Sequence, residues 1–256
     1  MLKTIKNILK KIFKTLNLEL RSIPPNANAH GLWTTPLFDF YYSSVYPNAT
    51  YSPWLNDSSF QEVYNNINKF TLVDIYRLYE LWDLAKQISN INGDYLEVGV
   101  WRGGSGILLA EAIKNISSKT IYLADTFKGV VKAGVNDITH NGGEHSNTSI
   151  KIVEDLINIY GLTNVRILEG IFPEDTAHHI PGKIAFIHCD VDVYQSSKDI
   201  VEWSLSRLSV GGVIVFDDYG FSSCEGVTKY CNELRLNSNF LFIHNLNGHA
   251  IFIKVK

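Results

Sequence analysis

The 256-residue sequence has few cysteines, no long apolar run and no excess of basic charge. Its three cysteines, Cys189, Cys224 and Cys231, form no CxxC spacing, which argues against a disulfide framework and predicts reduced thiols in a cytoplasmic protein. No apolar stretch is long enough to span a membrane. The formal net charge of −3 argues against a nucleic-acid partner. The length suffices for one large α/β domain with an appended arm.

Two apolar runs that stop abruptly at carboxylates are the most informative feature present. One ends in Asp190 and Asp192, and the other, opened by a Gly-Gly turn, ends in Asp217 and Asp218. If the runs are neighbouring parallel strands, the four carboxylates meet at the edge where open α/β sheets place their chemistry. Such a cluster repels itself unless a cation lies within it. The pattern therefore predicts a hard divalent metal, Mg²⁺ or Mn²⁺, with oxygen ligands.

Strand and helix patterns alternate from residue 71 onward and predict the fold class. Strands are predicted at Tyr95–Val98, Ile121–Ala124, Val165–Leu168, Ile184–His188 and Val213–Phe216, and a closing hairpin at Phe240–Ile243 and Ile251–Val255 around Asn247-Gly248. Helices are predicted from a Thr71 cap to Ala85 and at Ser105–Lys114, Ile150–Tyr160, Ser196–Leu208 and Glu225–Leu236. The result is an α/β, doubly wound, seven-stranded, mostly parallel sheet with a C-terminal antiparallel hairpin.

Residues 1–70 are predicted to form a helical and irregular N-terminal arm that serves as an acceptor lid or an oligomer contact. The catalytic domain is predicted at residues 71–256. Prolines interrupt residues 22–60, which we expect to be irregular. Residues 1–17 form an amphipathic, lysine-rich helix that is too interrupted for a signal peptide. Two interpretations stay open: peripheral contact with a membrane of anionic lipid, or packing on the body or on a second subunit of a homo-oligomer.

A glycine-rich loop follows the first predicted strand of the domain. Its spacing fits neither a dinucleotide fingerprint nor a Walker loop, but it has the E-x-G-x-x-x-G-G form used by class I S-adenosylmethionine methyltransferases. A carboxylate at the end of the second strand can accept both ribose hydroxyls. Phe172, at the end of the third strand, could line an adenine pocket or only pack in the core. The predicted cofactor-binding residues are Glu97, Gly99, Gly103, Gly104, Ser105, Asp125, Thr126, Gly170, Phe172 and Asp190.

These motifs resemble the metal-dependent sugar O-methyltransferases typified by the macrocin and mycinamicin O-methyltransferases. The matching segments are residues 93–104, 124–129, 190–196 and 208–220. The resemblance implies S-adenosylmethionine as methyl donor, a Mg²⁺ site at Asp190, Asp217 and Asp218, and a general base at Asp192. The loop 128–148 matches poorly; it holds four glycines and two histidines and is expected to be a lid or binding loop.

The expected reaction is Mg²⁺-dependent methylation of a sugar hydroxyl on a small molecule or glycan. A metal lowers the pKa of the hydroxyl, and Asp192 removes its proton. Asp192 could instead only support a metal ligand or the start of the following helix. His145 is a second catalytic candidate, as an acceptor contact or an alternative base. The competing functions are methylation of a catechol or another vicinal diol, and a D-x-D glycosyltransferase, which the glycine-rich loop does not favour.

Overall fold

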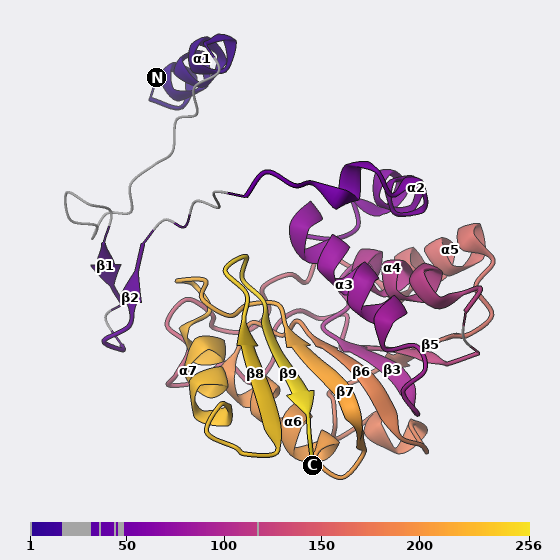
Figure 1. The fold of residues 1–256 in the computed structure, drawn as a ribbon. Helices are drawn as coiled ribbons and strands as arrows, with labels where there is room; N and C mark the ends of the chain where they lie inside the picture. The colour runs from indigo at the N-terminus through magenta and orange to yellow at the C-terminus, as the bar shows by residue number, and fades with distance from the viewer. Residues whose placement is uncertain (1, 17–31, 36, 44, 46–48, 117) are drawn as a thin grey trace. The chain divides into compact units, whose positions relative to one another are not determined.

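The computed structural model describes residues 2–16, 32–35, 37–43, 45, 49–116 and 118–256 in two compact units, Met1–Tyr46 and Pro47–Lys256 (Figure 1). The first unit contains helix α1 (Leu2–Thr15) and a short antiparallel pair, β1 (Trp33–Thr34) and β2 (Tyr41–Tyr42). The helix expected at the N-terminus is therefore present. The predicted irregular segment lies outside the described residues from 22 to 31.

The second unit is built on the predicted seven-stranded sheet. Its strands are β3 (Asp94–Val98), β4 (Ile121–Asp125), β5 (Val165–Glu169), β6 (Ile184–Cys189), β7 (Leu208–Phe216), β8 (Phe240–His244) and β9 (Ala250–Lys254). They lie in the order β5-β4-β3-β6-β7-β9-β8. The first five are parallel, and β9 runs antiparallel between β7 and β8. The predicted doubly wound sheet with its C-terminal hairpin is confirmed.

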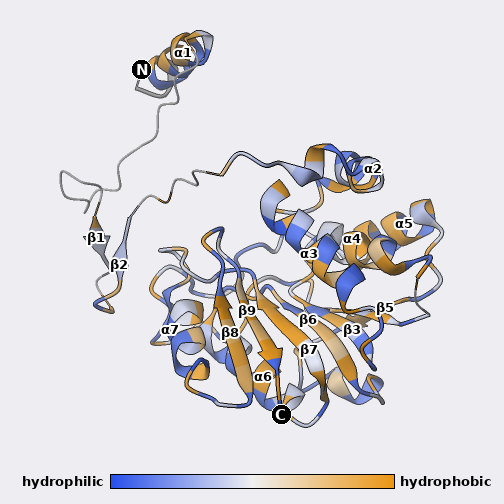
Figure 2. Cartoon of the chain, in the orientation of Figure 1, coloured by the Kyte–Doolittle hydropathy of each residue, from blue (hydrophilic) through white to orange (hydrophobic). Residues whose placement is uncertain are grey.

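Two hydrophobic clusters cover the two faces of this sheet, whose strands are almost uniformly apolar (Figure 2). Alternate residues of one strand enter opposite clusters, as the two-residue period of a strand requires. Tyr95 of β3 packs on the α3–α4 side and Leu96 on the α6–α7 side; Val215 and Phe216 of β7 divide in the same way. The carboxyl ends of the central strands are left to form the site.

Seven α-helices are described along the chain: α1, α2 (Ser58–Ile67), α3 (Ile75–Gln87), α4 (Gly104–Ile113), α5 (Ile150–Tyr160), α6 (Tyr194–Ser204) and α7 (Glu225–Leu234). Within the ranges that the structure describes, none combines the length and apolarity that a bilayer span requires. The predicted Thr71 cap is wrong, because Asp74 caps α3 by accepting the amides of Tyr76 and Arg77. The predicted helix to Leu208 is also too long, since Leu208 already pairs with Ile184 in the sheet.

Helix α2 begins at the end of the segment 22–60 that we expected to be irregular, and it lies within the predicted arm 1–70. Phe60, Val63 and Ile67 are buried in the core of the second unit. Asp57 connects the start of α2 to α3. One of its carboxylate oxygens accepts the Phe60 amide at 2.9 Å, and the other accepts the indole N–H of Trp82 at 3.0 Å. The compact unit that carries the sheet thus begins before residue 71, and residues 58–67 contribute to its core.

Candidate active site

A cavity of about 240 Å³ opens at the carboxyl ends of β3, β4, β6 and β7. It is lined by the loop after β3, the segment before α3, the loop after β4 and the acidic ends of β6 and β7. Its position is the usual ligand site of an open α/β sheet. Three non-glycine residues in its wall, Trp101, His145 and Asp192, have positive φ values of 48°, 61° and 64°. Backbone strain is therefore concentrated at this cavity.

Gly99 allows the loop after β3 to approach the end of β6. Its φ is +91°, and a Cβ atom there would lie 1.6 Å from the carbonyl oxygen of Asp190. No side chain can occupy that space. This contact holds the predicted cofactor loop beside the first acidic strand end.

Asp125 fixes the same loop from the other side. Its Oδ2 accepts the amides of Val100 and Trp101 at 2.7 and 2.8 Å, and its Oδ1 accepts the amide of Phe127 at 2.7 Å. Because a carboxylate oxygen offers two lone-pair sites, Oδ1 keeps one for a further donor such as a ribose hydroxyl. Thr126 has a local role, since its hydroxyl donates to the Gly129 carbonyl and accepts the Lys128 amide.

Most of the predicted cofactor residues line the cavity: Gly99, Ser105, Asp125, Thr126, Gly170, Phe172 and Asp190. Gly103 and Gly104 do not; Gly103 is the left-handed residue before α4, where φ is +89°. Phe172 serves both expected roles, because it borders the cavity while its ring packs edge-to-face on Trp203 at 4.9 Å. Glu97, also predicted to bind the cofactor, does not line the cavity. Strand alternation points this fully buried side chain under Gly106 of α4, where it bonds His188 at 2.8 Å.

Three of the four predicted carboxylates come together as a candidate metal site. Oxygen atoms of Asp190, Asp217 and Asp218 lie within 4.8 Å of one another. Burial and repulsion by Asp217 raise the pKa of Asp190, and burial and repulsion by Asp192 raise that of Asp218, both well above the usual range. Among the described residues, no side chain donates a hydrogen bond to the Asp190 carboxylate. Neither Asp190 nor Asp218 forms an ion pair within the described residues, and two adjacent carboxylates in this state suit a hard divalent cation.

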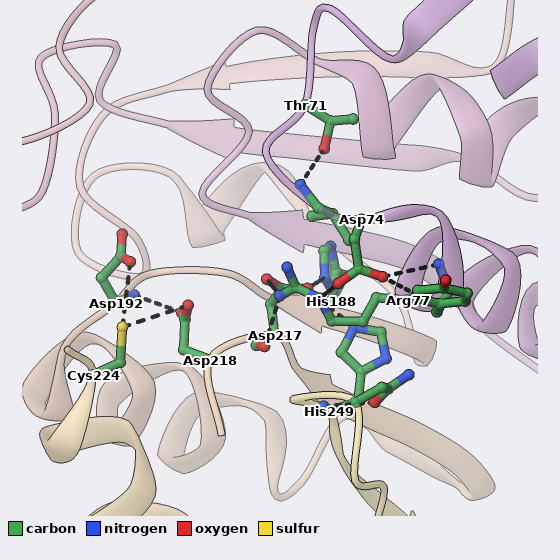
Figure 3. A network of polar contacts seen from close by, with 12 residues as sticks. Thr71, Asp74, Arg77, His188, Asp192, Asp217, Asp218, Cys224 and His249 are labelled. Atoms are coloured by element: carbon green, nitrogen blue, oxygen red, sulfur yellow. Dashed lines mark hydrogen bonds and ion pairs between the residues drawn. The ribbon is translucent and has the colours of Figure 1, made fainter. Parts of the chain in front are cut away.

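Asp217 differs because buried cationic side chains surround it (Figure 3). Arg77 of α3 pairs with its Oδ2 and also donates to its backbone carbonyl at 3.1 Å. His249 Nε2 lies 3.0 Å from Oδ1, and His188 Nε2 lies 3.6 Å away. Burial alone would raise the pKa of Asp217, but these hydrogen bonds and the Arg77 charge hold it well below its usual range. These surroundings therefore favour the ionised form of Asp217 within the cluster.

The two histidines belong to one buried polar row across the sheet, on the α3–α4 side. The row runs from Glu97 through His188, Asp217 and His249 to Glu80 of α3. The side chain of His188 is completely buried. Burial would lower the pKa of His188, yet the Asp217 and Glu97 carboxylates outweigh it and raise this pKa to about 10. The hydrogen bond with Glu97 gives His188 a structural role in this row.

Sequence reasoning missed Arg77, Glu80 and His249. A signal for His249 exists in the register: Phe216 pairs with Ala250, so Asp217 and His249 are the next residues of the two strands. That signal required knowing that β9 lies beside β7. Nothing in the sequence marks Arg77, which occupies an ordinary position of a helix pattern.

Asp192 lies at the opposite side of the acidic cluster, between the metal-site carboxylates and the loop after β4. Its backbone N–H donates to Asp218 Oδ2 at 3.1 Å. His140 Nε2 lies 3.6 Å from Asp192 Oδ1, and His145 Nε2 lies 4.0 Å from Oδ2. The thiol of Cys224 is 3.7 Å from Oδ1. Burial and the Asp217 charge raise the pKa of Asp192 to about 6.

A hydrogen bond and two ion pairs attach the expected lid loop 128–148 to neighbouring parts of the second unit. Asp137 accepts the amide of Tyr194 at 2.9 Å, at the start of α6. Lys132 pairs with Glu174 and Asp199, each at 2.6 Å. His140, one of the two histidines of this loop, is 7 % exposed, and its Nδ1 has no hydrogen-bond partner in the described chain. His145 is 41 % exposed and lines the cavity.

Known proteins resemble this chain in fold and in sequence. The solved structure of the O-methyltransferase NovP matches with a TM-score of 0.64 and 25% identity, over 73% of this chain and 83% of NovP. The fold is that of the class I S-adenosylmethionine methyltransferases. The family model of macrocin O-methyltransferase (TylF) matches residues 64–252, and the chain accordingly belongs to this family of O-methyltransferases. The predicted family and enzyme class are confirmed.

Two curated relatives are O-methyltransferases by name, and the name of one includes a rhamnosyl group. The 8-demethyl-8-(2,3-dimethoxy-alpha-L-rhamnosyl)-tetracenomycin-C 4'-O-methyltransferase of Streptomyces olivaceus is 30% identical over 196 residues, which cover 71% of this chain and 74% of that protein. The mycinamicin III 3''-O-methyltransferase of Micromonospora griseorubida is 32% identical over 177 residues, which cover 62% and 69%.

Proposed function

We propose that this protein transfers a methyl group from S-adenosylmethionine to a sugar hydroxyl and that the transfer depends on Mg²⁺. The observation that carries the proposal is the cavity that joins the Gly99 loop to the carboxylates of Asp190 and Asp218. One part of it suits a nucleoside and the other a divalent cation. The names of the relatives support a sugar as acceptor.

The metal would be held by Asp190, Asp217 and Asp218. Their oxygen atoms lie close enough to share one ion, and oxygen ligands suit Mg²⁺. When bound, such an ion supplies Lewis-acid polarisation of an acceptor hydroxyl and lowers its pKa. Asp217 is already balanced by Arg77 and His249. Asp190 and Asp218 have no such ion-pair partner within the described residues, so a bound cation would chiefly stabilise the ionised forms of these two side chains.

Asp192 is the residue that would take the acceptor proton. It borders the cavity beside the metal ligands, yet its own carboxylate is oriented toward His140, His145 and Cys224 rather than toward them. The hydrogen bond that the backbone N–H of Asp192 donates to Asp218 holds Asp192 next to the cluster. A base in this position is within one hydrogen bond of an acceptor held at the metal site. His145 contributes a more exposed, longer contact, which suits recognition of the acceptor.

The loop 128–148 and the segment before α3 would enclose the acceptor. Val130, Val131 and His145 come from the loop, and Leu72 and Val73 from the segment. Apolar walls exclude water from a reaction in which water would compete for the methyl group. They also provide surface for the C–H face of a sugar or for an apolar aglycone.

The test is methyl transfer from radiolabelled S-adenosylmethionine to sugar acceptors, including mycinamicin III and rhamnosyl tetracenomycins, with Mg²⁺ or with EDTA. We expect product only with the metal. In Asp192→Asn, turnover should fall by about 10²–10⁴ while titration calorimetry shows unchanged binding of S-adenosylhomocysteine. Unchanged turnover of Asp192→Asn would remove this residue as the base. Full activity in EDTA would refute the metal requirement. Methylation of catechols alone would refute a sugar as the acceptor.

A further inference from the structure

We propose that helix α1 binds the surface of an anionic lipid bilayer, with its axis in the plane of the surface. At 3.6 residues per turn, its apolar residues occupy a continuous arc of about 140°, and its lysines occupy the opposite arc (Figure 2). Ile5, Ile8 and Ile12, on the apolar arc, are 50 %, 54 % and 50 % exposed. Within its own unit the helix therefore leaves the described part of its apolar arc largely exposed.

The charge of the helix identifies the kind of surface. Lys3, Lys6, Lys10, Lys11 and Lys14 precede the first acidic residue, Glu19. The chain has 23 Lys and Arg against 26 Asp and Glu, so five lysines in α1 leave an excess of eight acidic residues elsewhere. A basic face beside an apolar face is the pattern of helices that bind anionic lipid. The remainder of the chain, by its charge, would be repelled by the same lipid.

The length of α1 determines how it would bind. Its 14 residues extend about 21 Å, which is shorter than the hydrocarbon layer. It can lie in the interface with its isoleucines among the acyl chains and its lysines at the headgroups, but it cannot cross.

Pairing with α1 of a second copy is the less favoured alternative. In two such helices face to face, most of the lysines would lie on the arc opposite the contact and remain in water. A second copy would therefore cover the apolar arc but leave the basic arc without a partner. Anionic lipid offers a partner to both arcs, so the charge pattern favours lipid phosphate over a second copy.

The test is co-sedimentation of the full-length chain with vesicles of phosphatidylcholine alone and vesicles that contain about one third phosphatidylglycerol. We expect binding to the anionic vesicles, much weaker binding to the neutral ones, and loss of binding as salt is raised. Replacing Lys6, Lys10, Lys11 and Lys14 by Gln should weaken binding by more than about a hundredfold, at about fivefold per lysine. Ile12→Glu should also abolish binding, because it places a charge within the apolar face.

The matched control changes four lysines of the second unit to Gln, namely Lys69, Lys151, Lys198 and Lys256. This control should bind anionic vesicles as well as the unmodified chain. Calorimetric binding of S-adenosylhomocysteine shows in every variant that the catalytic unit is folded. The proposal is overturned if the unmodified chain does not sediment with anionic vesicles, or if the α1 lysine variant binds as well as the control. A dimer that Ile12→Glu dissociates, in a chain without vesicle binding, would instead assign the face to a second copy.

Discussion

Replacing Arg77 by Met should destabilise the second unit far more than the loss of a surface charge does. The guanidinium bridges α3 to the end of β7: it pairs with Asp217, bonds Asp74 at 2.9 Å through Nε, and lies 4.9 Å from the ring centre of Phe221. Side-chain exposure is 8 % for Arg77 and 5 % for Asp217. Removing one partner of a buried pair leaves an uncompensated charge, which costs about 3–5 kcal/mol.

For a unit of this size, that loss corresponds to a fall in Tm of about 6–20 °C. Differential scanning calorimetry in EDTA measures it. The matched control is Lys151→Met, which breaks an ion pair whose side chains are 71 % and 53 % exposed and should change stability by less than about 1 kcal/mol. Arg77→Lys keeps the charge but loses the fork of donors, so its Tm should fall between the two.

Added Mg²⁺ should restore part of the stability lost in Arg77→Met, because a bound cation again places positive charge beside Asp217. A loss in Tm no larger than that of Lys151→Met would refute this account of Asp217. The carboxylate would then be compensated by His249 and His188 alone. A large loss without any recovery in Mg²⁺ would retain the ion pair but argue against cation binding at these carboxylates.

Three further outcomes follow from the site. Asp217→Asn should lower the Tm in EDTA because Arg77 and His249 lose their anionic partner. Asp218→Asn should leave the Tm unchanged or raise it, because the substitution removes repulsion between carboxylates. A fall of equal size in both variants would contradict the charge assignment. Gly99→Ala should abolish folding or S-adenosylhomocysteine binding because the added Cβ meets the Asp190 carbonyl. Gly143→Ala, also at positive φ but in open space, should lower the free energy of unfolding by about 1 kcal/mol. Equal effects would show that β3 and β6 can separate there. His140→Asn should reduce kcat more than His145→Gln does, because His140 is buried and closer to Asp192. Neither substitution should change the affinity for S-adenosylhomocysteine. A larger fall in kcat for His145→Gln would assign the positioning of the base to His145.

The sheet could be predicted from the sequence because each strand is locally marked. Apolar runs bounded by turn residues located all seven strands within a few residues, and the Asn247-Gly248 turn located the hairpin. Helix ends were less certain. Thr71 and Asp74 are both plausible caps, and only the packing of α3 decides between them. Leu208 continues the pattern of α6 yet pairs with Ile184, because contacts between strands override local periodicity.

The acidic strand ends could be predicted because sheet topology alone brings them together. The positions of Glu97, His140 and Arg77 could not. Glu97 fits a cofactor motif in sequence, but its place in the strand alternation turns it to the buried face below Gly106. His140 lies in a loop without periodicity, so its burial depends on contacts such as that of Asp137 with the start of α6. These are tertiary facts that no short pattern contains.

The uneven distribution of cations explains how four carboxylates can lie together before any metal binds. Arg77 and His249 hold Asp217 ionised, and burial with mutual repulsion favours protonation of Asp190 and Asp218. The protein thus keeps one fixed anion and two carboxyl groups that a divalent cation would deprotonate on binding. Asp192 lies beside this cluster: its backbone N–H donates to Asp218, and its carboxylate faces the histidines of the loop. The Asp217 charge raises the pKa of Asp192 as well. A change at Arg77 or His249 should therefore alter both metal binding at the proposed ligands and the pKa of the proposed base.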